Sequence, residues 1–326
     1  MFNPLIIVRD IHFASSMVVA GIIFFDLFIA APVFRSNSRF KTFEPAFRGA
    51  AENILWISLA VSVASALTWL CLLSMRITDK ALDEVITDGT VWTVLSQTQF
   101  GFAWDVRLAL AAALAVCLLW QRKKNEGQIA IALRALACLL AAAYLASLAF
   151  AGHGGEGLGG ERFIHLAADG LHLIAAALWL GALIPFVLLL SRLHALGEEG
   201  AVSAASAVGN RFSTLGVLAV GILLASGIIN ASFLLEGLHS LIDTPYGLLL
   251  LLKIMLFAAM LCVAGVNRQY LLPRLGHDAK PDQDSRTVRQ LFRNSLIEIA
   301  LGGGIILLVG MLGIMAPAKD VAGHVH

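Results

Sequence analysis

Three side chains that can bind a metal lie on one face of an otherwise apolar stretch. His165, Asp169 and His172 belong to the segment HLAADGLHLIAAALWLGALIP. At about 100° per residue of an α-helix, these side chains fall within about 60° of one another. Imidazole and carboxylate groups bind transition metals. The pattern predicts a metal-binding face at the start of an apolar helix, where Asp169 either binds the ion or orients an imidazole.

Two further histidines extend this prediction to other segments. His12 lies in the first apolar stretch and His153 lies shortly before the segment that contains His165 and His172. A separation of seven residues corresponds to about 10.5 Å of helix rise, too far for His165 and His172 to share one ion comfortably. We therefore expect an outer level with His153 and His165 and a deeper level with His12 and His172. The alternative is that these groups are solvated in the headgroup layer and bind nothing.

Weaker ligand candidates lie near the C-terminus. Met311 and Met315 are one helical turn apart, and thioether ligands would select Cu(I), although methionine in an apolar helix is usually packing. The tail GHVH places His324 and His326 where they could collect or release a metal ion.

Three charged residues lie within apolar stretches, where an ionisable group is a candidate functional residue. Asp26 could extend a polar route inward, couple a proton, or pair with Arg48 or Lys253. Arg107 and Lys253 could reach the membrane surface through their long side chains, with Asp105 pairing Arg107, or could balance a bound anion or carboxylate. Two other polar groups, Glu298 and Asn230, are candidates with less support.

The elements that carry these residues follow from composition. The chain has 326 residues, of which 59% are hydrophobic and 14% charged, with a mean hydropathy of +0.83. This composition is typical of an all-α polytopic membrane protein. The four cysteines stand singly in apolar runs, so we expect them to pack as free thiols. Eight stretches are long enough to span a bilayer: 11–34, 51–75, 102–120, 129–151, 164–191, 212–236, 246–271 and 296–316.

The positive charges predict the orientation. The loops after the first, third, fifth and seventh spans hold fifteen Lys and Arg residues, and the loops on the opposite side hold five. The positive-inside rule therefore places both termini outside the cytoplasm, with seven of the nine histidines on that outer side. A net charge of +1 with dispersed cations gives no argument for a nucleic-acid partner, so we expect none, and no GxxxxGK[ST] nucleotide loop occurs.

An internal repeat relates the two halves of the chain. TQFGFAWDVR at 98–107 and TPYGLLLLLK at 244–253 share T-x-[FY]-G, five further residues and a cation. The spacing of His12 to Gly21 recurs from His172 to Gly181. We predict two parallel four-helix repeats within one membrane domain, the first comprising 1–128 and 129–155 and the second 156–326. His12 and His172 would then lie at equal depth and could face each other.

A charged segment between the second and third spans is too short to cross a membrane. TDKALDEVITDGTVWTVLSQ has a helix-forming pattern, and Thr78 is a candidate N-cap. We expect one surface helix that covers the site from outside.

The segments that contain these motifs also resemble a known family. The chain resembles the copper resistance protein D (CopD) family. The resemblance lies in TQFGFAWDVR, the AGH at 151–153, HLAADGLHLIAAALWLGALIP, RFSTLGVLAVGILLASGIIN, DTPYGLLLLLK, VNRQYLLPRL and LFRNSLIEIALGGGIILLVGMLG. The resemblance implies an eight-helix protein of the bacterial inner membrane that handles copper. It also implies a periplasmic copper-binding partner of the CopC type.

We therefore expect a protein that transfers copper, as Cu(I) or Cu(II), from the periplasm toward the cytoplasm. We do not expect an enzyme. One alternative is a membrane protein that binds haem b through paired histidines, with a nearby cation for a propionate. Another is a scaffold that docks a periplasmic copper carrier without transporting copper.

Overall fold

The computed structural model describes residues 3–36, 44–123, 127–151, 159–196, 201–275, 281–316 and 319, and within these ranges it is helical without strands. Among the described residues, eight helices are long and apolar enough to cross a membrane, which confirms the expected number. They are Pro4–Ser36, Glu44–Thr78, Gln99–Lys123, Gly127–Ala151, Gly160–Leu193, Ala201–Leu234, Pro245–Arg274 and Asp284–Leu312. Every span begins before its predicted apolar limit, because the flanking polar residues also adopt helical geometry, whereas the sixth and eighth spans end earlier than predicted, at Leu234 and Leu312.

Several spans change helix type along their length. The first comprises α1 (Pro4–Phe25), η1 (Asp26–Ala30) and α2 (Ala31–Ser36). The fifth comprises α8 (Gly159–Ala176), η5 (Ala177–Gly181) and α9 (Ala182–Leu196), and the seventh α12 (Pro245–Val266), η6 (Asn267–Leu271) and η7 (Leu272–Arg274). The others are α3 (Glu44–Thr78), α6 (Gln99–Lys123), α7 (Gly127–Ala146) with η3 (Ser147–Ala151), α10 (Ala201–Leu234) and α13 (Pro281–Leu312). The elements η1, η5 and η6 are π-helical.

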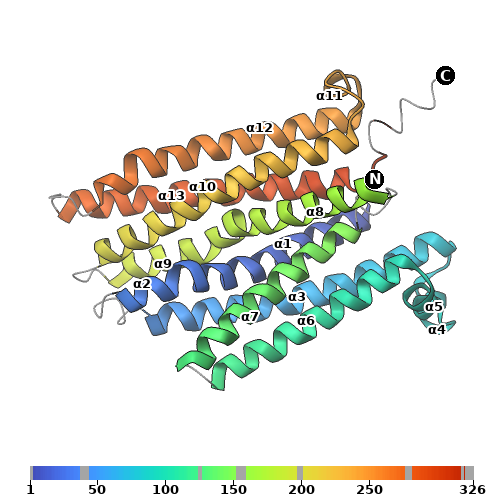
Figure 1. Cartoon of the computed structure of the whole chain (residues 1–326), viewed down its shortest axis with the longest axis horizontal. Coiled ribbons are helices and arrows are strands. Elements are labelled where there is room, and N and C mark those ends of the chain that lie inside the picture. The colour runs from blue at the N-terminus through green and yellow to red at the C-terminus, as the bar shows by residue number, and fades with distance from the viewer. Residues whose placement is uncertain are drawn as a thin grey trace.

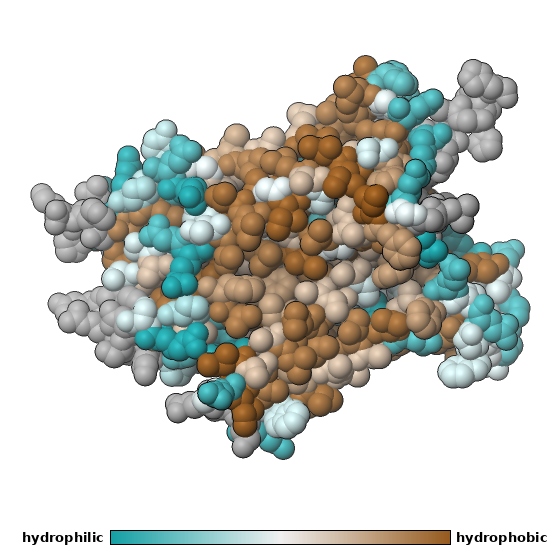
Figure 2. Space-filling model, in the orientation of Figure 1, coloured by the Kyte–Doolittle hydropathy of each residue, from teal (hydrophilic) through white to brown (hydrophobic). Residues whose placement is uncertain are grey.

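The spans form one bundle with an apolar belt. α1 begins and α13 ends at the end of the bundle that carries the short helices α4 (Leu82–Thr87), α5 (Thr90–Gln97) and α11 (Ser240–Asp243) (Figure 1). Figure 2 shows hydrophobic residues around the middle of the bundle and polar residues at both ends. Exposed side chains such as Ile57, Phe102, Leu139, Ile228 and Met255 contribute to this belt. Such a surface suits contact with lipid.

The first and fifth spans form the centre of the bundle. Their most apolar windows are 72% and 61% buried, whereas that of the seventh span is 6% buried. A Cβ atom on Gly21 would overlap the backbone of Gly181, and one on Gly181 would overlap the carbonyl of Met17. The two glycines that share the repeat spacing therefore let α1 and η5 meet backbone to backbone.

The segment between the second and third spans differs from the prediction. Instead of one helix, it folds into α4 and α5, which are separated at Asp88 and Gly89. Gly89 has φ 78°, a left-handed conformation that suits glycine. Thr78 is the last residue of α3, where its hydroxyl donates to the Ser74 carbonyl, so the expected N-cap role is wrong. Ala81 occupies the N-cap position of α4.

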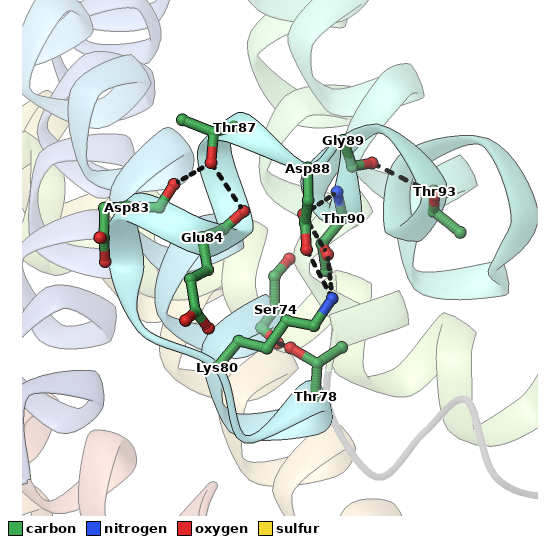
Figure 3. A network of polar contacts seen from close by, with 10 residues as sticks. All are labelled: Ser74, Thr78, Lys80, Asp83, Glu84, Thr87, Asp88, Gly89, Thr90 and Thr93. Carbon is green, nitrogen blue, oxygen red and sulfur yellow. Dashed lines mark hydrogen bonds and ion pairs between the residues drawn. The ribbon is translucent and has the colours of Figure 1, made fainter.

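Asp88 holds this surface segment together (Figure 3). Its carboxylate accepts a hydrogen bond from Lys80 Nζ at 2.5 Å, and bonds from the Thr90 amide at 2.9 Å and the Thr90 hydroxyl at 2.6 Å. These donors, Lys80 first, lower the pKa of Asp88 to about 2. The carboxylate therefore stays ionised at every physiological pH and fixes the corner between the two short helices.

The cysteines agree with the sequence analysis. Cys71, Cys117, Cys138 and Cys262 are all free thiols.

Candidate functional site

His12 is enclosed by the helices of the first half. Its Nδ1 lies 2.9 Å from the Ser62 carbonyl oxygen and 3.0 Å from Ser65 Oγ, both on α3. Arg107 Nε, on α6, donates to His12 Nε2 at 2.8 Å. Because Nε2 accepts this bond, the proton of the neutral ring resides on Nδ1. The ring is fully buried, and both of its nitrogens are satisfied by protein groups.

Arg107 is the centre of this network. It is 1% exposed, and its NH1 donates to the Tyr144 carbonyl at 2.8 Å and to Ser147 Oγ at 2.7 Å. Its NH2 donates to Ser16 Oγ at 3.1 Å, and the guanidinium lies 4.2 Å from the centre of the Tyr144 ring. The expected ways of accommodating Arg107 are therefore wrong: the side chain does not reach the surface, and Asp105 is exposed rather than paired with it.

His172 is held in a similar way within the second half. Its Nδ1 lies 2.9 Å from Ser226 Oγ on α10, and that hydroxyl donates to the Ile222 carbonyl at 2.6 Å. Nδ1 therefore carries the proton and donates it to the serine, which leaves a lone pair on Nε2. No group in the described part of the chain forms a hydrogen bond to Nε2. Lys253 on α12 lies close enough for its charge to act on His172, and the charge of Asp169 acts on Lys253.

The two histidines share one pattern of contacts with a single difference. Each binds, through Nδ1, a serine on the second helix of its own half, Ser65 or Ser226. Each of these hydroxyls also contacts the backbone carbonyl three residues earlier, at 3.0 Å and 3.4 Å respectively. On the third helix, Arg107 bonds its histidine, whereas Lys253 does not. Both ring nitrogens of His12 are bonded within the first half, so His12 offers no available nitrogen for an ion shared with His172.

The T-x-[FY]-G motif fixes the positions of Arg107 and Lys253 relative to the starts of their helices. The Thr98 hydroxyl accepts a bond from the Gly101 amide at 2.9 Å, and the Thr244 hydroxyl does the same for Gly247 at 2.9 Å. A Cβ on either glycine would overlap a carbonyl of the preceding residues, in α5 and α11 respectively. The motif therefore combines a helix cap with a close approach of a short surface helix. The cation follows six residues after each glycine.

The other ligands predicted on α8 face α10. His165 is 9% exposed and stacks on Phe233, with 4.8 Å between ring centres. Asp169 Oδ1 accepts a hydrogen bond from Asn230 Nδ2 at 3.3 Å. Within the described ranges, no three His, Cys, Asp or Glu side chains are grouped closely enough to hold a metal. His153, His324 and His326 lie outside those ranges.

The methionine pair does not converge on these histidines. Met311 is 39% exposed at the surface of the bundle. Met315 packs in a small hydrophobic cluster with Tyr246 and Leu312. The structure therefore agrees better with packing than with Cu(I) ligation for these two side chains.

Asp26 lies at the opposite end of the first half. Arg48 NH1 donates to its carboxylate at 2.6 Å, as one of the sequence alternatives expected, and Arg134 Nε lies 3.6 Å away. A cavity of about 460 Å³ opens beside it between α1, α3, α6 and α7, and Glu44 and Trp56 also line its wall. Asp26 is therefore accessible from this cavity.

A buried charged pair on α1 escaped the sequence analysis. Arg9 and Asp10 are each 7% exposed, and Arg9 NH1 donates to the Gly313 carbonyl at 2.6 Å. Arg9 also lies 4.9 Å from the centre of the Trp69 ring. The first span begins at Pro4 rather than at residue 11, so Arg9 and Asp10 lie within it. The helix-start signal Asn3–Pro4, with Pro4 five residues before Arg9, was the available clue.

Comparisons with known proteins agree with this architecture. The N-terminal domain family described as copper resistance protein D-like matches residues 1–163, and the copper resistance protein D family matches residues 206–312. Copper resistance protein D of Pseudomonas syringae pv. tomato is 28% identical across 98% of this chain and 99% of its own length. Inner membrane protein YebZ of Escherichia coli is 27% identical across 96% and 98%.

A third relative is longer. Copper transport protein CutJ of Bacillus subtilis is 30% identical over 57% of this chain, which corresponds to 33% of the relative. No solved structure matches this chain. Because the N-terminal domain family covers half of the sequence and the second family covers most of the remainder, the chain belongs to the copper resistance protein D family.

Proposed function

We propose that this protein binds copper at the outer face of a bacterial inner membrane and passes it through the second helical half toward the cytoplasm, thereby contributing to copper resistance and homeostasis. The names of the relatives support copper as the cargo and the inner membrane as the location. The observation that carries the site is the available Nε2 lone pair of His172, one helical turn from Asp169.

The chemistry of this face suits copper. Ser226 fixes the tautomer and orientation of His172, which is the usual role of a group behind a metal-binding imidazole. Asp169 adds a carboxylate on the same side of α8, and His165 lies one turn farther out. A nitrogen and oxygen ligand set of this kind binds copper. We assign the initial contact to His165 and the deeper binding to His172 with Asp169.

Lys253 gives the site a way to remain neutral without copper. Its charge acts on Asp169 and on His172. An ammonium on a flexible stem can pair with the carboxylate in the absence of copper and swing aside when the ion binds. Copper and Lys253 would therefore compete for Asp169, so that release of the ion restores the pairing.

The first half has a supporting role in this proposal. We infer that the halves are parallel repeats with both termini outside the cytoplasm, since the paired His, Ser and cation positions recur in the same order. In the first half, Arg107 occupies the nitrogen of His12 that a metal would need. The same contact argues against haem b held by His12 and His172. Asp26 and its cavity would form a separate polar opening of the first half on the proposed cytoplasmic side.

A periplasmic copper carrier of the CopC type would deliver the ion to the outer end. There, α4 and α5 lie at one edge of the bundle and α11 at the opposite edge (Figure 1). A scaffold without transport would bind copper at this end and leave cytoplasmic copper unchanged in His172 variants.

Copper titration of the purified protein tests the site. We expect His172→Ala to lower copper affinity by about tenfold or more, since it removes the principal ligand. His239→Ala is the matched control, because His239 is an exposed histidine at the same end of the bundle. Equal affinity in His172→Ala and the parent protein would reject the assignment. A Soret band in the absorption spectrum would support haem instead.

A further inference from the structure

Glu298 is a carboxyl group buried at the centre of a span. It lies fourteen residues from each end of the span Asp284–Leu312 and is 2% exposed. The middle of a membrane helix is the most costly place for an ionised side chain, and such residues usually serve a function. Neither the copper-binding face on α8 nor the network around Arg107 uses this group.

The neighbours that bond Glu298 are neutral donors. Trp179 Nε1 donates to one carboxyl oxygen at 3.2 Å, and Asn267 Nδ2 donates to the other at 2.8 Å. Asn294 Nδ2 in turn donates to Asn267 Oδ1 at 2.7 Å and thereby orients that amide. These bonds stabilise the ionised carboxylate without neutralising its charge.

Both donors come from π-helical segments. Trp179 lies within η5, and Asn267 is the first residue of η6. A π-helical turn inserts an extra residue and changes the direction of the side chains around it, and such turns occur frequently at functional sites. Two separate spans therefore deviate from α-helical geometry where they reach Glu298.

No charged group pairs with Glu298 within the described helices. α13 packs against α1, α9, α10, α12, η5 and η6. Lys253 of α12 precedes Asn267 by fourteen residues, or about 21 Å of helix. Arg268 of η6 donates to Ser213. The remaining charged or titratable side chains described on these elements are Arg9, Asp10 and His12 of α1, Arg192 of α9, Arg211 of α10, Tyr246 and Cys262 of α12, Tyr270 of η6, and Asp284, Arg286, Arg289 and Arg293 of α13.

A protonated Glu298 has an acceptor close by. Ser295 precedes it by three residues, so the two side chains lie on the same face of α13. The Ser295 hydroxyl is fully buried and has no hydrogen-bond partner among the described residues. The N–H groups of Trp179 and Asn267 point at the carboxyl group and would repel a metal cation, whereas they leave lone pairs for a proton.

We propose that Glu298 is a proton-binding site at the middle of the membrane. The carboxylate takes a proton from water to become a neutral acid that donates to Ser295 Oγ, and it returns that proton to water when it ionises. Trp179 follows His172 by seven residues, so the proton would bind about 10.5 Å inward from the copper-binding face along the fifth span. Proton binding at Glu298 does not require copper at His172.

Infrared difference spectroscopy of the full-length protein in phosphatidylcholine nanodiscs tests this proposal. Between about pH 4 and pH 10, the range where perturbed carboxyl groups titrate, we expect a C=O band of a buried protonated carboxyl that disappears as the pH rises. Glu298→Gln should remove the band, because glutamine preserves the shape and the acceptor for Trp179 but cannot ionise. Glu236→Gln is the matched control at an exposed glutamate and should keep the band.

Two further variants keep the test decisive. Trp179→Phe removes one donor to the carboxylate and should move the titration midpoint about one pH unit upward. Asp10→Asn removes a second buried carboxyl, and the band should survive it. Loss of the band in Asp10→Asn, its persistence in Glu298→Gln, an unmoved midpoint in Trp179→Phe, or no titrating band in the parent protein would each overturn the proposal.

Discussion

At the scale of single residues, the difference between arginine and lysine separates the two halves. Arg107 presents a planar fork that bonds His12, Ser16, Ser147 and the Tyr144 carbonyl together. Lysine carries a compact charge on a flexible stem and cannot reproduce that fork. The first histidine is therefore fixed as part of the packing, while the second keeps a nitrogen available for a ligand.

Replacing Lys253 by arginine should close the available nitrogen of His172. In Lys253→Arg, the guanidinium can donate to His172 Nε2 as Arg107 donates to His12, so we expect copper affinity to fall about ten- to a hundredfold. Competition with a copper chelator of known affinity measures the change.

Lys253→Met is the matched variant, because methionine removes the charge and keeps a similar length. It should bind copper as well as the parent protein or more tightly, since no ammonium competes for Asp169. Equal weakening in both variants would mean that Lys253 supports the fold and does not control access to His172.

At the scale of elements, the sequence predicts those structural features that depend on a few adjacent residues or on the apolar length of a segment. Apolar length gives the eight spans, and the motifs at Thr98 and Thr244 predict equivalent helix starts, because a cap depends on a few adjacent residues. The partners of Arg107 come from two other spans, the first and the fourth, so no local pattern could reveal them. The π-helical turns at Trp179 and Asn267 likewise depend on tertiary packing.

The contact between Gly21 and Gly181 can be tested directly. In Gly21→Val, the side chain would overlap the backbone of η5, so we expect a loss of about 1–3 kcal/mol of stability. Thermal unfolding in detergent, monitored by circular dichroism, measures this effect.

Gly221→Ala is the control for a glycine with open space around its Cα. It should leave the unfolding temperature unchanged or slightly higher, because alanine favours a helix. If both variants unfold at the same temperature as the parent protein, the first and fifth spans do not depend on this close approach.

At the scale of the whole molecule, the apolar belt and the positive charges define two ends. The belt separates the polar ends in Figure 2. The C-terminal ends of α6 and α9, which carry Arg122 and Arg192, lie at the end opposite α4 and α5 (Figure 1). Arg274 ends the seventh span, which starts beside α11. Because cytoplasmic loops are enriched in Lys and Arg, this charge difference supports an outer location for both termini. The histidines of the copper-binding face would then meet copper from the periplasm.

This orientation predicts which surface positions a membrane-impermeant maleimide can reach. The four native cysteines are free, so they can be replaced without breaking a disulfide. In that background, Lys80→Cys should be labelled in intact spheroplasts, because Lys80 lies beside α4 and α5 on the proposed outer side. Arg274→Cys, also at an exposed position, should be labelled only after the membrane is opened. The reverse labelling pattern would mean that the protein has the opposite orientation in the membrane. The face that carries His165 and His172 would then bind copper from the cytoplasm and export it.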